Sequence, residues 1–301
     1  MNHKAHEFSL RPGSCIKPLR SLVLFAFIVS ALGAETPLES AIALFQAKKY
    51  PEAEAAFRTL SDEDPQNASA HFHLGVLADK RGENSEAIQH LERAVQLAPD
   101  NSEYHTELGG AYGDAAKSAG LLASLTWARK CVASLVRAVE LNPENLVARN
   151  GLITFYREAP PIAGGGIEKA YVQAHEIRQR DLSMGSAILG QLYISERKYP
   201  EAFEVYEDVL QQKPDDYQAL YLIGRTAAET GTNLDRGEQA LRRCLELPPG
   251  PGEQGRAAVQ WRLGQLAEKR GDIPAARAAY EAALQSHPGF QQAADSLAKL
   301  N

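Results

Sequence analysis

The chain has 301 residues, of which 44% are hydrophobic and 23% charged, with 23 Gly and 16 Pro. These values exclude a collagen-like chain, a wholly disordered chain and a membrane protein with many spans. The net charge of −6 argues against a basic nucleic-acid-binding protein, and three cysteines are too few for a disulfide framework or a series of zinc sites.

Residues 1–34 have the parts of an export signal. Four basic residues and one acid precede an uncharged run at 21–33. This run is long enough for the apolar part of a signal peptide and shorter than the ~18 residues of a spanning helix. Small residues favour cleavage after Gly33 or Ala34. We therefore expect a signal peptide over 1–34 and a periplasmic protein, with anchoring by an uncleaved N-terminal helix as the alternative.

Removal of residues 1–34 makes the chain more acidic. It keeps 28 Lys and Arg against 37 Asp and Glu, a formal charge of −9. This charge disfavours nucleic acid and anionic lipid as partners. We expect no stable membrane insertion after leader cleavage. The remaining cysteines, Cys131 and Cys244, are expected to be buried as small apolar side chains that do not pair.

The rest of the chain repeats a pattern with a period near 34 residues. Each unit carries a Leu-Gly or Ile-Gly pair, then Ala or Tyr three residues after the glycine, and later a closing proline. The glycines are Gly75, Gly190, Gly224 and Gly264, and the prolines are Pro99, Pro214, Pro249 and Pro288. A glycine on one helix face lets a neighbouring helix approach closely. In the second helix a small, large, small stripe such as Ala202, Tyr206 and Val209 faces it.

Signals for helix ends recur at the same phase. Gly82, Gly231 and Gly271 fall where the first helix of a unit must end, and glycine suits a left-handed cap. Side chains suited to cap the next helix follow the closing prolines. These residues are Asn67, Asn101, Asn145 and Asp216.

This pattern resembles the tetratricopeptide repeat, and the resemblance covers nearly all of the chain after residue 34. It implies an all-α fold, a right-handed α-solenoid of about seven helix-turn-helix repeats over 35–290, with a capping helix over 291–301. The units are expected to start near 34, 68, 102, 146, 183, 217 and 257.

Two units depart from the period. The third has ten extra residues within 113–122, so its second helix is expected to restart near Ser124. The fourth carries 159–166, a proline- and glycine-rich link between its helices. Three consecutive glycines there lack the residue order of a phosphate-binding loop. Segments 113–122 and 159–166 are where a small-ligand or enzymatic role would be added.

No catalytic or metal-binding constellation stands out. His71 and His105 occupy equivalent positions in successive units and are candidates to meet at a helix contact, but no third ligand accompanies them. No nucleophile with a base, and no carboxylate pair, is evident. We expect no enzyme activity, no cofactor and no metal.

The first helices of a stacked solenoid line its concave side. Aromatic and Arg side chains with amides between them suit an extended peptide or a partner helix. We expect Tyr221 and Trp261 to be exposed in this groove, with packing against the adjoining repeat as the alternative. The predicted partner-binding residues are Phe72, Lys80, Asn150, Arg157, Gln191, Tyr221, Arg225, Trp261 and Gln265.

The sequence therefore predicts a non-catalytic scaffold or adaptor of the cell envelope that binds a segment of a partner protein in its concave groove. Chaperone-binding members of the resembled family grip a terminal carboxylate with Lys and Asn. The Asn positions here carry Val76, Gly110 and Gln191, which do not support that specificity. One alternative is a self-assembling structural protein, as a homo-oligomer. The other is the small-ligand or enzymatic role of the two segments.

Overall fold

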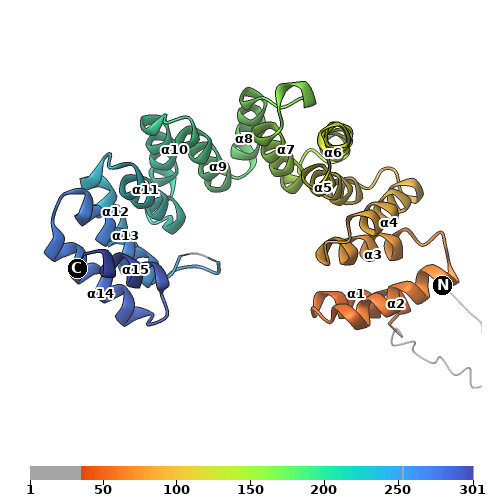
Figure 1. The fold of residues 1–301 in the computed structure, drawn as a ribbon, viewed down its shortest axis with the longest axis horizontal. Coiled ribbons are helices and arrows are strands. Elements are labelled where there is room, and N and C mark those ends of the chain that lie inside the picture. The colour runs from red at the N-terminus through yellow and green to blue at the C-terminus, as the bar shows by residue number, and fades with distance from the viewer. Residues whose placement is uncertain (1–34, 253, 301) are drawn as a thin grey trace, which may run out of the picture.

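The computed structural model describes residues 35–252 and 254–300, which form 15 α-helices, one 3-10 helix and no strand. The helices stack in sequence as an open arch whose two ends hold the first and the last helices (Figure 1). The prediction of an all-α solenoid of about seven repeats with a capping helix is confirmed. The predicted signal peptide lies outside the described residues.

Seven helix pairs build the arch, and the first helix of each pair begins within three residues of a predicted unit start. The pairs are α1 (Pro37–Gln46) with α2 (Tyr50–Glu63), α3 (Ala68–Lys80) with α4 (Asn84–Leu97), α5 (Ser102–Ser118) with α6 (Leu121–Leu141), α7 (Leu146–Glu158) with α8 (Ile167–Arg180), α9 (Leu182–Ser195) with α10 (Tyr199–Gln212), α11 (Tyr217–Thr230) with α12 (Leu234–Glu246), and α13 (Arg256–Lys269) with α14 (Ile273–Ser286). The 3-10 helix η1 (Pro161–Ala163) lies between α7 and α8, and α15 (Gln291–Lys299) follows the last pair.

The predicted helix-end signals act as expected. Asn67, Asn101, Asn145 and Asp216 each accept a hydrogen bond from a backbone N–H two or three residues later, at 2.9–3.2 Å. These bonds satisfy N–H groups that have no partner within the helix. Gly82, Gly231 and Gly271 follow their helices with φ of 76°, 77° and 77°, which glycine adopts without strain.

Asn145 joins two repeats as well as capping α7. Its Nδ2 donates to Ser102 Oγ at 2.8 Å and to Thr106 Oγ1 at 2.9 Å, both on α5. Asn145→Ala is therefore expected to lower the free energy of unfolding by about 1–2 kcal/mol, the upper part of the range for a lost cap. Asn67→Ala, which removes a cap without such a bridge among the described residues, should cost less. Urea unfolding of both variants checks this, and equal losses would contradict a role for the bridge.

Glycines of the first helices contact large side chains of the second helices, which are tyrosine rings in two pairs and leucines in three others. A Cβ added at Gly190 would lie 2.2 Å from the Tyr206 ring, and one at Gly264 would lie 2.3 Å from the Tyr280 ring. The repeated Leu-Gly pair therefore marks the place where the second helix presses a large side chain onto the first. Cys131 and Cys244 are buried and form no disulfide with each other, as predicted.

The expanded third repeat differs from the prediction. The extra residues lengthen both helices, so α5 continues to Ser118 and α6 already begins at Leu121. The predicted restart near Ser124 is wrong. Ala115, which is buried, and Ala116 have high helix propensity and extend α5. Segment 113–122 is thus helical apart from the two residues between α5 and α6.

Candidate partner-binding surface

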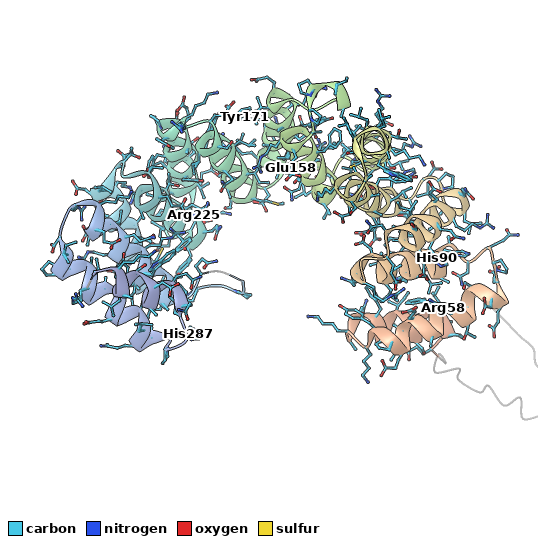
Figure 2. The ribbon with its side chains drawn as sticks, in the orientation of Figure 1. Arg58, His90, Glu158, Tyr171, Arg225 and His287 are labelled. Carbon is cyan, nitrogen blue, oxygen red and sulfur yellow. The ribbon has the colours of Figure 1, made fainter. Side chains whose placement is uncertain are left out.

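The first helices of the pairs face the inner side of the arch, and we call this side the concave surface. Glu158 and Arg225 lie toward it in Figure 2. Four of the predicted partner-binding residues are exposed, which are Lys80, Asn150, Arg157 and Gln191. Arg225 and Gln265 are partly buried. Arg225 Nη2 donates to Gln191 Oε1 at 2.9 Å, so these side chains of α11 and α9 meet across two repeats.

Two predicted aromatic residues do not belong to the exposed surface. Tyr221 is only 5% exposed and Phe72 only 7%. The Phe72 ring stacks on Tyr104 of α5 with 4.5 Å between centroids, and Tyr221 lies in the core cluster that spans α7 to α13. Their helix positions point at the next repeat instead of into the arch, so the alternative of packing between repeats holds for both.

Trp261 is partly buried and packs against the capping helix α15 at the C-terminal end of the solenoid. Its Nε1 donates to Ser296 Oγ on α15 at 3.0 Å, and its ring lies 6.0 Å from the Phe290 ring. The indole therefore attaches the capping helix to α13. Arg262 covers it, with the guanidinium carbon 4.4 Å from the ring centroid. The prediction that Trp261 is exposed in the groove is wrong, because the ring packs against the capping helix.

His71 and His105, the candidates for a histidine contact, each contact other residues. His71 Nδ1 lies 3.1 Å from His90 Nδ1 within its own repeat, whereas His105 Nε2 lies 2.9 Å from the Pro99 carbonyl oxygen. His71 and His105 were candidates for a contact because of their equivalent positions, and they do not form one. No group of three or more His, Cys, Asp and Glu side chains in the described part of the chain is arranged to hold a metal ion.

Stability should fall between pH 7.5 and 5.5. Burial lowers the pKa of His73 and of His90, and the charges of His71 and Arg58 lower the pKa of His90 further. Below the unfolded pKa of about 6.5 the unfolded chain binds more protons than the folded chain, so the free energy of unfolding decreases. We expect a smaller fall in melting temperature for His90→Gln than for the wild type in thermal scans across this range. His175→Gln, at an exposed position on α8, is the control, and an identical fall in all three proteins would contradict the prediction.

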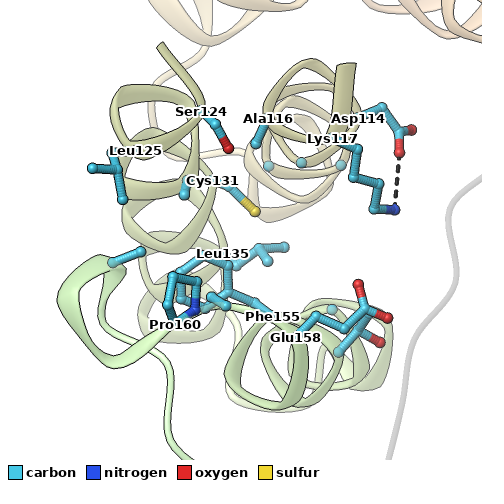
Figure 3. Close-up of a pocket in the computed structure, with 18 of the residues that line it drawn as sticks. Asp114, Ala116, Lys117, Ser124, Leu125, Cys131, Leu135, Phe155, Glu158 and Pro160 are labelled. Atoms are coloured by element: carbon cyan, nitrogen blue, oxygen red, sulfur yellow. Dashed lines mark hydrogen bonds and ion pairs between the residues drawn. The ribbon is translucent and has the colours of Figure 1, made fainter. Parts of the chain in front are cut away.

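A cavity of about 640 Å³ opens between α5, α6 and α7, and we call it the α5–α7 cavity (Figure 3). It brings together parts of the segments 113–122 and 159–166, which are distant in sequence. Its residues from α5 are Thr106, Glu107, Gly109, Gly110, Gly113, Asp114, Ala116 and Lys117. The others are Leu121, Ser124, Leu125, Ala128, Cys131, Leu135, Val147, Gly151, Thr154, Phe155, Glu158, Ala159, Pro160 and Ala163.

This cavity exists because glycines on α5 have no side chain to fill it. A Cβ at Gly110 would have no heavy atom within 4 Å, and one at Gly113 would meet only Cys131 Sγ, at 3.5 Å. The α5 backbone therefore forms an open wall. Burial raises the pKa of the Cys131 thiol to about 11, so it stays protonated at neutral pH and is a poor nucleophile. The pattern of glycines on α5 was a signal for the cavity that the sequence analysis missed.

Acidic groups dominate the charge of the α5–α7 cavity. Lys117 Nζ pairs with Asp114 Oδ1 at 3.1 Å (Figure 3). Glu107 and Glu158 have no ion pair within the described residues. Burial, and then the nearby charges of Asp79 and Glu103, raise the pKa of Glu107. The cavity thus combines apolar walls with two carboxyl groups that lack a positive neighbour in contact.

The family model of the tetratricopeptide repeat matches residues 38–102, 189–253, 232–289 and 262–298. The chain belongs to the tetratricopeptide repeat family. Such repeats generally mediate protein–protein interactions, and this repeat protein is accordingly an interaction scaffold. None of its described helices combines the length and apolar character that crossing a membrane requires.

Similar proteins agree with this membership. The repeat protein is 26% identical to human tetratricopeptide repeat protein 13 over 213 residues, which are 67% of this chain and 22% of that protein. It therefore spans about a fifth of the length of that relative. The solved C-terminal part of a repeat protein from Cytophaga hutchinsonii has a TM-score of 0.57 and 18% identity, covering 86% of this chain and 99% of that one. A repeat protein from Parabacteroides merdae has a TM-score of 0.56 and 13% identity, with 88% and 96% covered. Both structures show the fold alone.

Proposed function

We propose that this protein is a non-catalytic adaptor of the cell envelope whose concave surface binds a segment of a partner protein. The observation that carries the proposal is the set of exposed polar side chains that the first helices α3, α7 and α9 present, which are Lys80, Asn150, Arg157 and Gln191. Arg225 extends this set and is held in place by Gln191. Guanidinium and amide groups fixed on rigid helices suit the recognition of a peptide backbone and its side chains.

Photo-crosslinking in living cells tests where the partner binds. A crosslinking amino acid replaces Gln191 on the concave surface or, as the control, Arg242, which is exposed on the second helix α12. We expect a discrete adduct with another protein from position 191 and none from position 242. Adducts only between copies of this chain would favour the self-assembling alternative. Equal adducts from both positions, or none from either, would contradict binding on the concave surface.

A reporter fusion tests the proposed location. Residues 1–34, with their basic start and apolar run, are joined to a reporter that is active only outside the cytoplasm and expressed in a Gram-negative host. We expect an active reporter in the periplasmic fraction, shortened by cleavage near Ala34. An uncleaved reporter in the membrane fraction would favour the anchored alternative. An inactive reporter retained in the cytoplasm would contradict export.

A further inference from the structure

We propose that the α5–α7 cavity anchors the partner through a short segment in which a bulky apolar side chain stands next to Lys or Arg. The inference rests on the proposed function and specifies the chemistry of the partner at one place on the concave surface. Three features of the cavity support it, namely its shape, its glycine wall and its charge.

The cavity is elongated along α5. Its α5 residues run from Thr106 to Lys117, a distance of about 17 Å at a rise of about 1.5 Å per residue. About five residues of extended chain cover this length at about 3.3 Å each. The volume of about 640 Å³ lies within the usual range of sites that bury a ligand group. An elongated peptide segment fits this shape better than a compact small molecule does.

The walls of the cavity offer apolar side chains for contact and let a partner chain come close to the α5 backbone. The backbone at Gly110 is open to the cavity, so a partner chain can approach α5 there without meeting a side chain, and at Gly113 it would contact only Cys131. Leu135 and Phe155 are buried at the base, whereas Leu121 is 81% exposed and Val147 67%. Exposed apolar side chains beside a cavity are typical of interaction sites, because covering them removes apolar surface from water.

The charge of the cavity selects the sign of the partner. Of the four acid and base side chains that line it, Lys117 forms an ion pair with Asp114, and its charge also acts on Glu158. Among the described residues Glu107 and Glu158 are in no ion pair themselves, so both carboxyl groups can still accept a partner cation. The two carboxyl groups come from α5 and α7, so they flank the site from two helices. Asp79 and Glu103 add negative charge near Glu107, and the charge of Lys80 offsets part of it. A lysine or arginine beside the apolar anchor would relieve this repulsion, and an acidic residue would increase it.

Peptide display with matched variants tests the inference. Random 12-residue peptides are selected on the full-length protein, and the selected peptides are then titrated against three variants. Gly110→Phe fills the cavity from its open wall, and Glu107→Gln with Glu158→Gln removes charge without changing volume. Ala133→Phe, at an exposed position of α6 outside the cavity, controls for added bulk. Circular dichroism and melting curves check that each variant is folded.

We expect the selected peptides to carry Lys or Arg beside Leu, Ile, Phe or Trp. Their affinity should fall at least tenfold with Gly110→Phe and several-fold with the double Gln variant, and should not change with Ala133→Phe. If Gly110→Phe fails to fold, the peptide affinity of the double Gln variant still tests the inference. Enrichment of acidic peptides, full binding to both cavity variants, failure to enrich any peptide, or a small molecule retained in the cavity in native mass spectra would each overturn the inference. Peptides whose affinity is unchanged by Gly110→Phe but falls with Arg225→Glu would overturn this inference. They would leave the proposal of binding on the concave surface standing.

Discussion

Replacing Gly185 by alanine is expected to destabilise the protein by about 2 kcal/mol, near the middle of the usual range for overpacking. An ideal Cβ at Gly185 would lie 2.2 Å from both Cα and N of Arg178. These are backbone atoms of α8, so no side chain can rotate away to make room. A single residue, Asp181, connects α8 to α9, and this short link holds the two helices together.

The matched control is Gly110→Ala, which introduces the same methyl group into a helix where nothing lies within 4 Å. Alanine has a higher helix propensity than glycine, so this variant should gain up to about 1 kcal/mol. The two identical substitutions should therefore shift the urea midpoint in opposite directions. Because repeats contact only their neighbours, Gly185→Ala should also broaden the transition by uncoupling the two halves of the arch. An unchanged midpoint for Gly185→Ala would contradict the close approach of α8 and α9.

Tyr206→Ala should have the largest effect on stability, about 3–5 kcal/mol, as for other large aromatic side chains in a core. Tyr206 is completely buried, and its ring fills the space left by Gly190 on the facing helix. Loss of the ring would open a void between α9 and α10 that neither helix can close alone. Burial also raises the pKa of Tyr206 to about 12, in agreement with a dry environment.

Tyr206→Phe separates the ring from its hydroxyl group. Apart from an interaction with the Thr226 side chain, the buried hydroxyl finds no hydrogen-bond partner among the described residues, so its removal should change the free energy of unfolding by less than about 1 kcal/mol. Urea unfolding of both variants gives the comparison. A loss for Tyr206→Phe as large as that for Tyr206→Ala would show that the hydroxyl, and not the packed ring, carries the stability at this position.

The features that sequence predicts best here are local. Asn67 and Asn145 cap their helices because a cap needs only an N–H three residues away, and Gly82 ends α3 because only a positive φ is required. The Leu-Gly pairs likewise specify a close approach within one repeat. Such signals recur with the period of the repeat, so the number of repeats and the fold class follow from them.

The features that the sequence misses depend on how repeats are placed against each other. Tyr221 occupies a first-helix position that faces either solvent or the next repeat, and only the superhelical twist decides that it is buried. The helical continuation to Ser118 depends on α6 packing beside α5. The α5–α7 cavity joins Gly110 to Pro160 across two repeats, a juxtaposition that no local pattern contains.

Hydrogen–deuterium exchange tests the central claim, that a partner segment binds on the concave surface, most directly. Exchange is measured on the full-length protein with and without the segment captured at position 191 or selected by display. We predict slower exchange in the inner helices α5, α7 and α9 and unchanged exchange in the outer helices α4, α8 and α10. Protection confined to the outer helices, with the inner helices unchanged, would contradict the claim.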